Sequence, residues 1–277
     1  MTDDNEKAGR EFDDFDPEPK GGSSINMGMM PTIGAMKGAL AECTIIPVNA
    51  SYDDRSAFRE NPAALTLVMA VFCFVELIVY LILAKIDDAI FKGNISMLVA
   101  FIAIFFPFFL FRFNFVTDLV RFGNKLFPGN ADAGAGIIFA MMFVLATFIF
   151  YMDINGFGSE FILLTAPMVD ICCIHAVVSS MKFAGKGDGL ILSLIITVVA
   201  ALLFMFLGIA IIGDLEYKFV LIGVVAVLVA SISGILEALL GKAKAGEDDC
   251  ITGAAYEFSR PIILGISTLV FLMMAMN

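Results

Sequence analysis

The chain has 277 residues, of which 60% are apolar and only 16% are charged, and its mean hydropathy is +0.92. This composition is typical of an integral membrane protein and excludes a water-soluble enzyme. The formal net charge is −11, and no basic stripe follows any expected element, which excludes a nucleic-acid-binding protein.

The N-terminal segment is acidic and poor in apolar residues. Residues 1–20 carry eight acidic and three basic side chains, and a Gly-Gly-Ser-Ser stretch follows them. Such a segment cannot bury enough apolar surface to offset the entropy that it loses on ordering. We therefore expect residues 1–35 to form a disordered acidic tail, and residues 36–277 to form a single membrane-embedded domain.

Seven apolar runs follow, each close to the ~20 residues that a helix needs to cross the hydrocarbon layer. They are continuously apolar rather than alternating, which favours helices over barrel strands. A shorter segment, 36–48, is expected to be an interfacial helix that ends at Pro47. The expected fold is an all-α, polytopic membrane bundle of about seven transmembrane helices, at 64–84, 95–112, 134–152, 161–181, 190–213, 219–240 and 261–276.

Basic residues are distributed unequally between the two sets of loops. The loops after the first, third and fifth spans contain three lysines or arginines, and the loops after the second, fourth and sixth contain eight. The positive-inside rule therefore predicts a multi-pass protein of the cell membrane, with the N-terminus and the second set of loops in the cytoplasm. That set comprises Arg112, Arg121, Lys125, Lys182, Lys186, Lys242, Lys244 and Arg260.

Glu76 and Asp170 are carboxylic acids inside the expected spans. Ionisable groups are costly in a bilayer, so Glu76 in the first span and Asp170 in the fourth are either functional or structurally paired. The single histidine, His175, follows Asp170 by five residues, which is about 140° around a helix. A proton-relay pair of these two residues on one helix is therefore disfavoured.

Small residues in the spans are expected to pack. The five cysteines form no C-x-x-C pair, so a zinc or iron–sulfur site is disfavoured, and the adjacent Cys172 and Cys173 are expected to be apolar packing residues. The sixth span should present a face on which two helix backbones approach closely. This face comprises Gly223, Ala226, Ala230 and Gly234.

Polar side chains and glycines gather in the three loops expected on the cytoplasmic side. A magnesium ion with a diphosphate substrate requires carboxylates, glycine amides and one or two cations, although short loops between helices commonly contain the same residues. The candidates are Asn114, Asp118, Asn124, Lys125 and Asp132 in the first loop, Lys186 and Asp188 in the second, and Lys244 and Asp249 in the third.

These segments resemble the motifs of one family in order and spacing. Residues 40–48 are similar to F-L-T-R-I-P-V, and residues 114–126 to N-H-L-D-G-L-A-D-F-G-D-G-L. Asp132 with Gly136 resembles K-D-S-R-I-G, residues 185–190 resemble the E-G-L-G turn, and residues 249–257 resemble G-G-x-T-G-D-x-L-G-A-x-x-E. The chain after residue 36 thus resembles the cobalamin synthase family, adenosylcobinamide-GDP ribazoletransferase.

The resemblance implies a Mg²⁺-dependent phosphotransferase that joins adenosylcobinamide-GDP to α-ribazole, or to its 5′-phosphate, with release of GMP. Other proteins of cobalamin assembly would be candidate partners, beside the lipid bilayer. The resemblance implies catalytic roles for Asn114, Asp118 and Asp132, with Asp118 and Asp132 as the metal ligands. It implies substrate-binding roles for Asn124, Lys125, Lys186, Asp188, Asp249 and Glu257.

Four positions of the first motif depart from the family pattern. The histidine is replaced by Phe115, and three acids are replaced by Thr117, Arg121 and Asn124. One alternative is therefore an inactive paralogue that binds a corrinoid or assists an active homologue. Another is a small membrane transporter that uses Glu76 and Asp170. A CDP-alcohol type transferase is set aside, because its D-G-x-x-A-R acid cluster does not occur in the chain.

Overall fold

The computed structural model describes residues 31–91, 96–111, 114–127, 134–157, 159–212, 218–245 and 250–275. Within these ranges every regular element is helical, as the composition predicts. The elements are α1 (Ile33–Cys43), α2 (Tyr52–Glu60), α3 (Ala63–Ile86), the π-helical segment η1 (Asp87–Phe91), α4 (Ser96–Leu110), α5 (Asn114–Leu126), α6 (Gly134–Phe157), α7 (Ser159–Phe183), α8 (Leu190–Ile212), α9 (Lys218–Ala245) and α10 (Cys250–Ala275).

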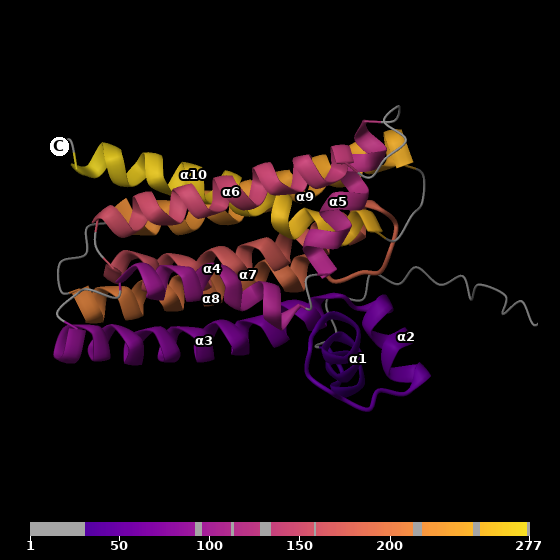
Figure 1. Ribbon diagram of the computed structural model, residues 1–277. Coiled ribbons are helices and arrows are strands. Elements are labelled where there is room, and N and C mark those ends of the chain that lie inside the picture. The colour runs from indigo at the N-terminus through magenta and orange to yellow at the C-terminus, as the bar shows by residue number, and fades with distance from the viewer. Residues whose placement is uncertain are drawn as a thin grey trace, which may run out of the picture.

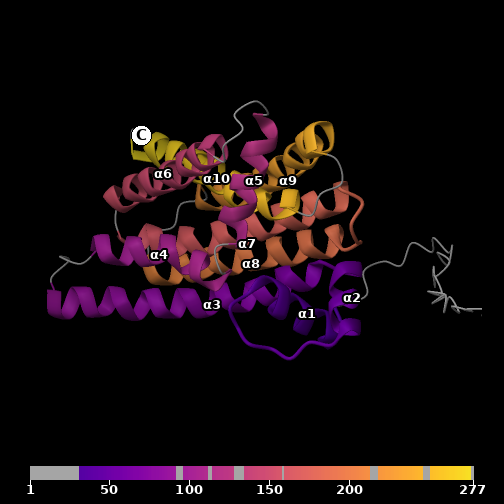
Figure 2. The ribbon, with the colours of Figure 1, turned by 45° about the vertical axis from the view of Figure 1, so that its right-hand side comes forward.

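Helix α7 is the centre of the bundle. Every residue from Thr165 to Ser180 is buried, because α3, α8, α9 and α10 all pack against this helix. Both views show α3 along one edge of the bundle and α6 and α10 along the opposite edge (Figures 1 and 2). The short helices α1, α2 and α5 gather at one end of the bundle, and the C-terminus lies at the other (Figure 1).

The outer surface of the long helices is apolar. Four helices in the described part of the chain are long and apolar enough to cross a membrane, over Ala63–Leu83, Gly134–Ile154, Thr165–Phe183 and Ile222–Lys242. Exposed apolar faces of this kind suit lipid rather than water, and several such helices indicate a membrane protein. The expected number of about seven spans is not confirmed. The exposed residues include Val71, Val75, Ile78 and Ile82 on α3 and Ile138, Met141, Met142 and Leu145 on α6.

Two expected loops are helical. Residues 114–126, expected in a loop, form α5, and α10 begins at Cys250, eleven residues before the expected start of the last span. Pro261 therefore lies inside α10 and not at its start. Arg260 was expected in a cytoplasmic loop, but its side chain is 0% exposed in the bundle interior. It therefore no longer supports the orientation inferred from loop charges.

The N-terminal helices differ from the expected single interfacial helix. Helix α1 begins at Ile33, within the range expected for the tail, because the Thr32 side chain accepts a hydrogen bond from the Ala35 amide. It ends at Cys43, before Pro47, where the Thr44 amide and hydroxyl both donate to the Leu40 carbonyl. Helix α2, which was not expected, starts with a capping box of Ser51 and Asp54.

The turn between α7 and α8 depends on three glycines. Gly185, Gly187 and Gly189 have φ values of 84°, 76° and 137°, which side-chain-bearing residues rarely adopt. The turn docks on the α2–α3 connection, where the Asp188 amide donates to the Glu60 carbonyl at 2.9 Å. Glycine is thus required here for the backbone conformation and, at Gly187 and Gly189, for close packing.

Close helix packing uses small residues, as the sequence predicts. The expected face of α9 is buried at Gly223, Ala226, Ala230 and Gly234. A Cβ atom at Gly234 would collide with the Ala176 carbonyl of α7, so these two backbones are in direct contact. The burial of this face and the contact of Gly234 with Ala176 confirm the predicted packing face of α9.

A similar contact joins α5 to α6 and can be tested with a matched pair of glycines. A Cβ atom at Gly136 would collide with the Val120 carbonyl and the Asn124 side chain, whereas one at Gly134 would meet nothing within 4 Å. We expect Gly136→Ala to lower the free energy of unfolding by about 1–3 kcal/mol through overpacking. Gly134→Ala should leave it nearly unchanged. Thermal unfolding in detergent measures both, and equal midpoints for the two variants would contradict the contact.

Candidate functional site

Helix α5 carries four of the nine candidate site residues and is strongly amphipathic. Its apolar positions Phe115, Leu119 and Phe122 recur at helical spacing and are buried. Its polar positions, including Asn114, Thr117 and Arg121, are exposed. The sequence therefore folds this segment as an amphipathic helix that covers the bundle end and presents its polar residues outward.

Asp118 lies at the contact between α5 and α10. Its carboxylate abuts Gly253, where a Cβ atom would collide with Asp118 Oδ2. Asp118 Oδ1 is 3.6 Å from Arg121 Nη1, and 20% of the Asp118 side chain is exposed. Burial raises the pKa of Asp118 to about 6, and the positive charge of Arg121 offsets only part of this effect. The structure thus brings together Asp118 and Gly253 of the last motif.

The position of the family's histidine is occupied by an aromatic stack. Phe115 lies against Tyr256 of α10, with ring centroids 4.7 Å apart and planes 23° apart. Phe111 contacts both rings, at 4.5 Å from Phe115 and 5.6 Å from Tyr256. These rings hold α5 on α10 by apolar packing, and Phe115 has no group that could exchange a proton.

Two other motif residues have structural partners. The Asn124 side-chain oxygen accepts a hydrogen bond from the Gly136 amide in the first turn of α6, at 2.8 Å. Asp188 is exposed and pairs with Lys182, and its turn docks on α2 and α3. Lys186, in the same turn, is partly buried. These contacts position helix ends and give no separate evidence for substrate binding.

Part of the expected metal site cannot be compared with the structure. Asp132 and Asp249 lie outside the described residues, as does the side chain of Lys244. Within the described ranges, no group of three His, Cys, Asp or Glu side chains could hold a metal ion. Magnesium ligation by Asp118 together with Asp132 therefore stays a prediction.

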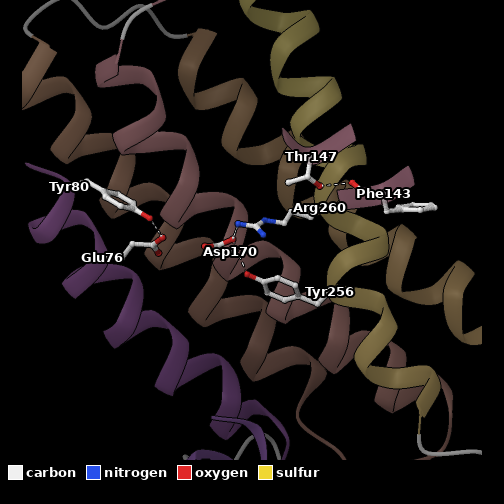
Figure 3. A network of polar contacts seen from close by, with 7 residues as sticks. All are labelled: Glu76, Tyr80, Phe143, Thr147, Asp170, Tyr256 and Arg260. Atoms are coloured by element: carbon white, nitrogen blue, oxygen red, sulfur yellow. Dashed lines mark hydrogen bonds and ion pairs between the residues drawn. The ribbon is translucent and has the colours of Figure 1, made fainter. Parts of the chain in front are cut away.

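A second candidate site lies inside the bundle. Asp170 of α7 is between Glu76 of α3 and Arg260 of α10 (Figure 3). Asp170 Oδ1 is 3.4 Å from Arg260 Nη2 and accepts a 2.8 Å hydrogen bond from the Tyr256 hydroxyl. Glu76 Oε1 accepts a 2.7 Å hydrogen bond from the Tyr80 hydroxyl. The two intramembrane acids that the sequence singled out are therefore parts of one network.

Arg260 is enclosed by aromatic rings. Its guanidinium carbon is 5.5 Å from the centre of the Phe108 ring, 5.6 Å from that of Tyr151 and 5.8 Å from that of Tyr256. Ring faces stabilise a cation where water cannot reach it. Glu257, one turn before Arg260, is also 0% exposed. It was expected to bind substrate from a loop, but it belongs to this interior cluster.

His175 belongs to a different part of the core. Its ring nitrogens lie 2.9 Å from Ser193 Oγ of α8 and 3.0 Å from Ser231 Oγ of α9. Asp170, in contrast, faces α3 and α10. The prediction that His175 and Asp170 do not share a helix face is confirmed.

The buried ion pair generates a prediction about stability. Arg260→Met removes the only positive partner that the structure shows for Asp170, so we expect a loss of about 3–5 kcal/mol in the free energy of unfolding. Adding Asp170→Asn should recover part of this loss, because no unpaired charge then remains. Thermal unfolding in detergent measures both variants.

The control for that pair is Arg59, which bonds Glu42 at 3.4 Å but is 72% exposed. Arg59→Met should cost less than about 1 kcal/mol, because water screens the pair. A cost at Arg260 no greater than that at Arg59 would contradict a stabilising role for the buried pair.

The raised pKa of Asp118 generates a second prediction. Between the ordinary pKa of 3.8 and the folded pKa of about 6, the folded chain holds a proton that the unfolded chain has released. The contribution of this group to stability therefore decreases as the pH rises across that interval and is constant outside it. We expect Asp118→Asn to flatten the pH dependence of the unfolding midpoint from pH 4 to pH 6. An unchanged slope would show that Asp118 is solvated like a surface carboxylate.

Comparison of the chain with family models, with curated proteins and with solved structures finds no match. The geometry of the described residues is therefore the basis on which the resemblance to cobalamin synthases has to be judged. The described residues form two neighbouring candidate sites, one at the α5 end of the bundle and one in its interior.

Proposed function

We propose that this protein is a membrane phosphotransferase that joins adenosylcobinamide-GDP to α-ribazole, or to its 5′-phosphate, and releases GMP. The observation that supports this proposal most is the contact of Asp118 with Gly253. It joins the two segments most similar to the family, which are distant in the chain and packed together through α5 and α10. A single site built from both segments would require this contact between α5 and α10.

The chemistry requires that the negative charge of the diphosphate is neutralised and that the attacking hydroxyl is aligned with the phosphorus. A ribose hydroxyl that is free in both acceptors, and therefore not the 5′ oxygen, attacks the phosphorus that carries the cobinamide, and the bond from that phosphorus to GMP breaks. The half-buried Asp118 carboxylate is suited to accept the hydroxyl proton or to contact the metal. Lys125 and Lys186, with Lys244, would contact phosphate oxygens as point charges.

A magnesium ion fits the part of this site that the structure describes. Mg²⁺ usually binds through one or two carboxylates together with substrate phosphates and water, rather than in a cage made of protein alone. Asp118 is one such carboxylate at a solvent-accessible edge, and Asp132 would be the second. When bound, the ion would neutralise charge on the diphosphate.

The orientation of the protein in the membrane is part of the proposal. Helices α1, α2 and α5 lie at the same end of the bundle (Figure 1), and the loops expected to be rich in Lys and Arg connect there. We place this end in the cytoplasm of a plasma-membrane protein, where soluble nucleotide substrates reach it.

A second candidate function is a non-catalytic paralogue that binds a corrinoid. The observation that favours it is the stack of Phe115 on Tyr256, which occupies the family's histidine position. The other alternative, a transporter, is favoured by the convergence of Glu76 and Asp170 on one buried network. Phosphotransfer is preferred because neither alternative requires the contact of Asp118 with Gly253.

The test is GMP release from adenosylcobinamide-GDP by the reconstituted protein, with α-ribazole and Mg²⁺ and with a control that lacks α-ribazole. We expect acceptor-dependent GMP and a cobalamin product. Asp118→Asn should lower kcat at least about tenfold, as loss of a metal or proton contact does. Gly253→Ala should lower it too, because it displaces Asp118.

The matched control is Asp153→Asn, which removes an exposed carboxylate near the end of α6 and should leave turnover unchanged. Unchanged turnover in Asp118→Asn combined with Asp132→Asn would remove the assigned roles. No GMP from the wild-type protein, with corrinoid binding retained, would establish the non-catalytic paralogue instead.

A further inference from the structure

The interior cluster contains more acids than the bundle can hold in ionised form. Glu76, Asp170 and Glu257 are 0–1% exposed, and Arg260 is the only lysine or arginine among the buried side chains of the described ranges. Three carboxylates around one guanidinium would leave two uncompensated negative charges away from water. Such charges are costly, and carboxyl groups in this position take up protons.

Several oxygens in the cluster face no donor in the described structure. Both carboxyl oxygens of Glu257 are buried without a hydrogen-bond partner, and so are Glu76 Oε2 and Asp170 Oδ2. The opposite oxygens of Glu76 and Asp170 accept hydrogen bonds from tyrosine hydroxyls. The unpartnered oxygens are therefore places where a small cationic ligand would sit.

The spacing of these groups selects the ligand. A metal ion needs several oxygens that converge, and the described side chains offer no group of three acids, cysteines or histidines that does so. A proton binds to a single carboxyl oxygen, and the protonated group can then donate a hydrogen bond to a nearby acceptor. The described side chains of the cluster therefore suit protons better than a divalent cation.

Buried polar groups continue from the cluster toward the end of the bundle at α5. Ser259, next to Arg260, is 2.5 Å from Ser233 of α9. One turn further along α9, Glu237 accepts a hydrogen bond from Ser180 of α7. Glu237 also lies close enough to Asp118 to interact with its charge, and Asp118 reaches solvent. Hydroxyl and carboxyl groups can each donate and accept a proton, and these groups lie between the cluster and the solvent at the α5 end.

We propose that Glu76, Asp170 and Glu257 around Arg260 form a proton-binding site inside the bundle, which exchanges protons with solvent at the α5 end through Ser259, Ser233 and Glu237. Proton binding at this cluster does not require the proposed transferase chemistry, but its route reaches solvent beside Asp118, which that chemistry also uses. The titratable and charged groups that face it are Cys73, Glu76 and Tyr80 on α3, Tyr151 on α6, Asp170, Cys172 and Cys173 on α7, and Tyr256, Glu257 and Arg260 on α10.

The test is infrared spectroscopy of the full chain in phosphatidylcholine vesicles at pH 7. We expect an absorption of protonated carboxyl groups that shifts when the vesicles are transferred to D₂O. Charge balance predicts two protonated carboxyls among the three cluster acids of the wild type and one in Glu257→Gln. The buried Glu237 adds one protonated carboxyl to both, so the intensity should fall by about a third. Asp153→Asn should leave the intensity unchanged.

The route is tested separately with mild substitutions that keep the acids in place. Ser233→Ala combined with Ser259→Ala should slow the shift in D₂O severalfold, whereas Ser267→Ala should not change its rate. Ser267 is a suitable control because its buried hydroxyl bonds the Ile263 carbonyl of its own helix, away from the route.

Three results would overturn the proposal. One is the absence of a protonated carboxyl absorption from the wild type at pH 7. Another is an absorption that stays fixed in D₂O while backbone amides exchange, which would indicate a sealed structural cluster. The third is equal exchange rates in the serine pair and the wild type, which would remove the route. The wild-type measurements need no variant, so poor folding of Glu257→Gln would not prevent the test.

Discussion

The ion pair of Asp170 and Arg260 is the interaction on which the interior of this protein depends. It joins the central helix α7 to α10, and the hydroxyl of Tyr256 and the ring faces around Arg260 complete its surroundings. A pair of this kind adds little net stability compared with apolar side chains, but either partner alone would be strongly destabilising. The pair therefore fixes which helices meet and in which register.

Close backbone contacts determine how the bundle end is built around that interior. Gly234 lets α9 approach α7, Gly136 lets α6 approach α5, and Gly253 lets α10 approach α5. Each contact leaves no room for a side chain. The half-buried state of Asp118 is a consequence of the last contact, because the α10 backbone excludes water from one side of its carboxylate. Packing and the chemical character of the proposed site are thus linked through one glycine.

The class of fold could be predicted from composition, because long apolar runs leave helices as the only regular structure that satisfies the backbone in lipid. The small face of α9 and the separation of His175 from Asp170 also follow from helical periodicity. The ends of elements were harder to predict. Pro261 suggested the start of a helix, because proline is favoured in a first helical turn and costly inside a helix, and Arg260 beside it suggested a loop. Only tertiary partners show that both lie in a helix interior.

The residue types of the candidate sites could be predicted from the sequence, but the contacts that bring these residues together could not. Asp118 stood out as a motif acid, but its contact with Gly253 depends on the packing of α5 on α10. Glu76 and Asp170 stood out as intramembrane acids, and their convergence depends on the placement of α3 against α7. The roles of Tyr80 and Tyr256 had no signal in the sequence, since tyrosines are common. Glu237 had one, because it lies inside the expected span 219–240, but it was not singled out.

The complete enclosure of α7 has a consequence for how the protein is assembled. Of the four helices in the described ranges that are apolar enough to span a membrane, α7 has the lowest mean hydropathy. Its polar residues Asp170, His175 and Ser180 have partners on α8, α9 and α10. All three of those helices are synthesised after it. During translation the polar groups of α7 therefore lack these hydrogen-bond partners, beside α3 or at the insertion machinery, until the C-terminal third of the chain has been synthesised.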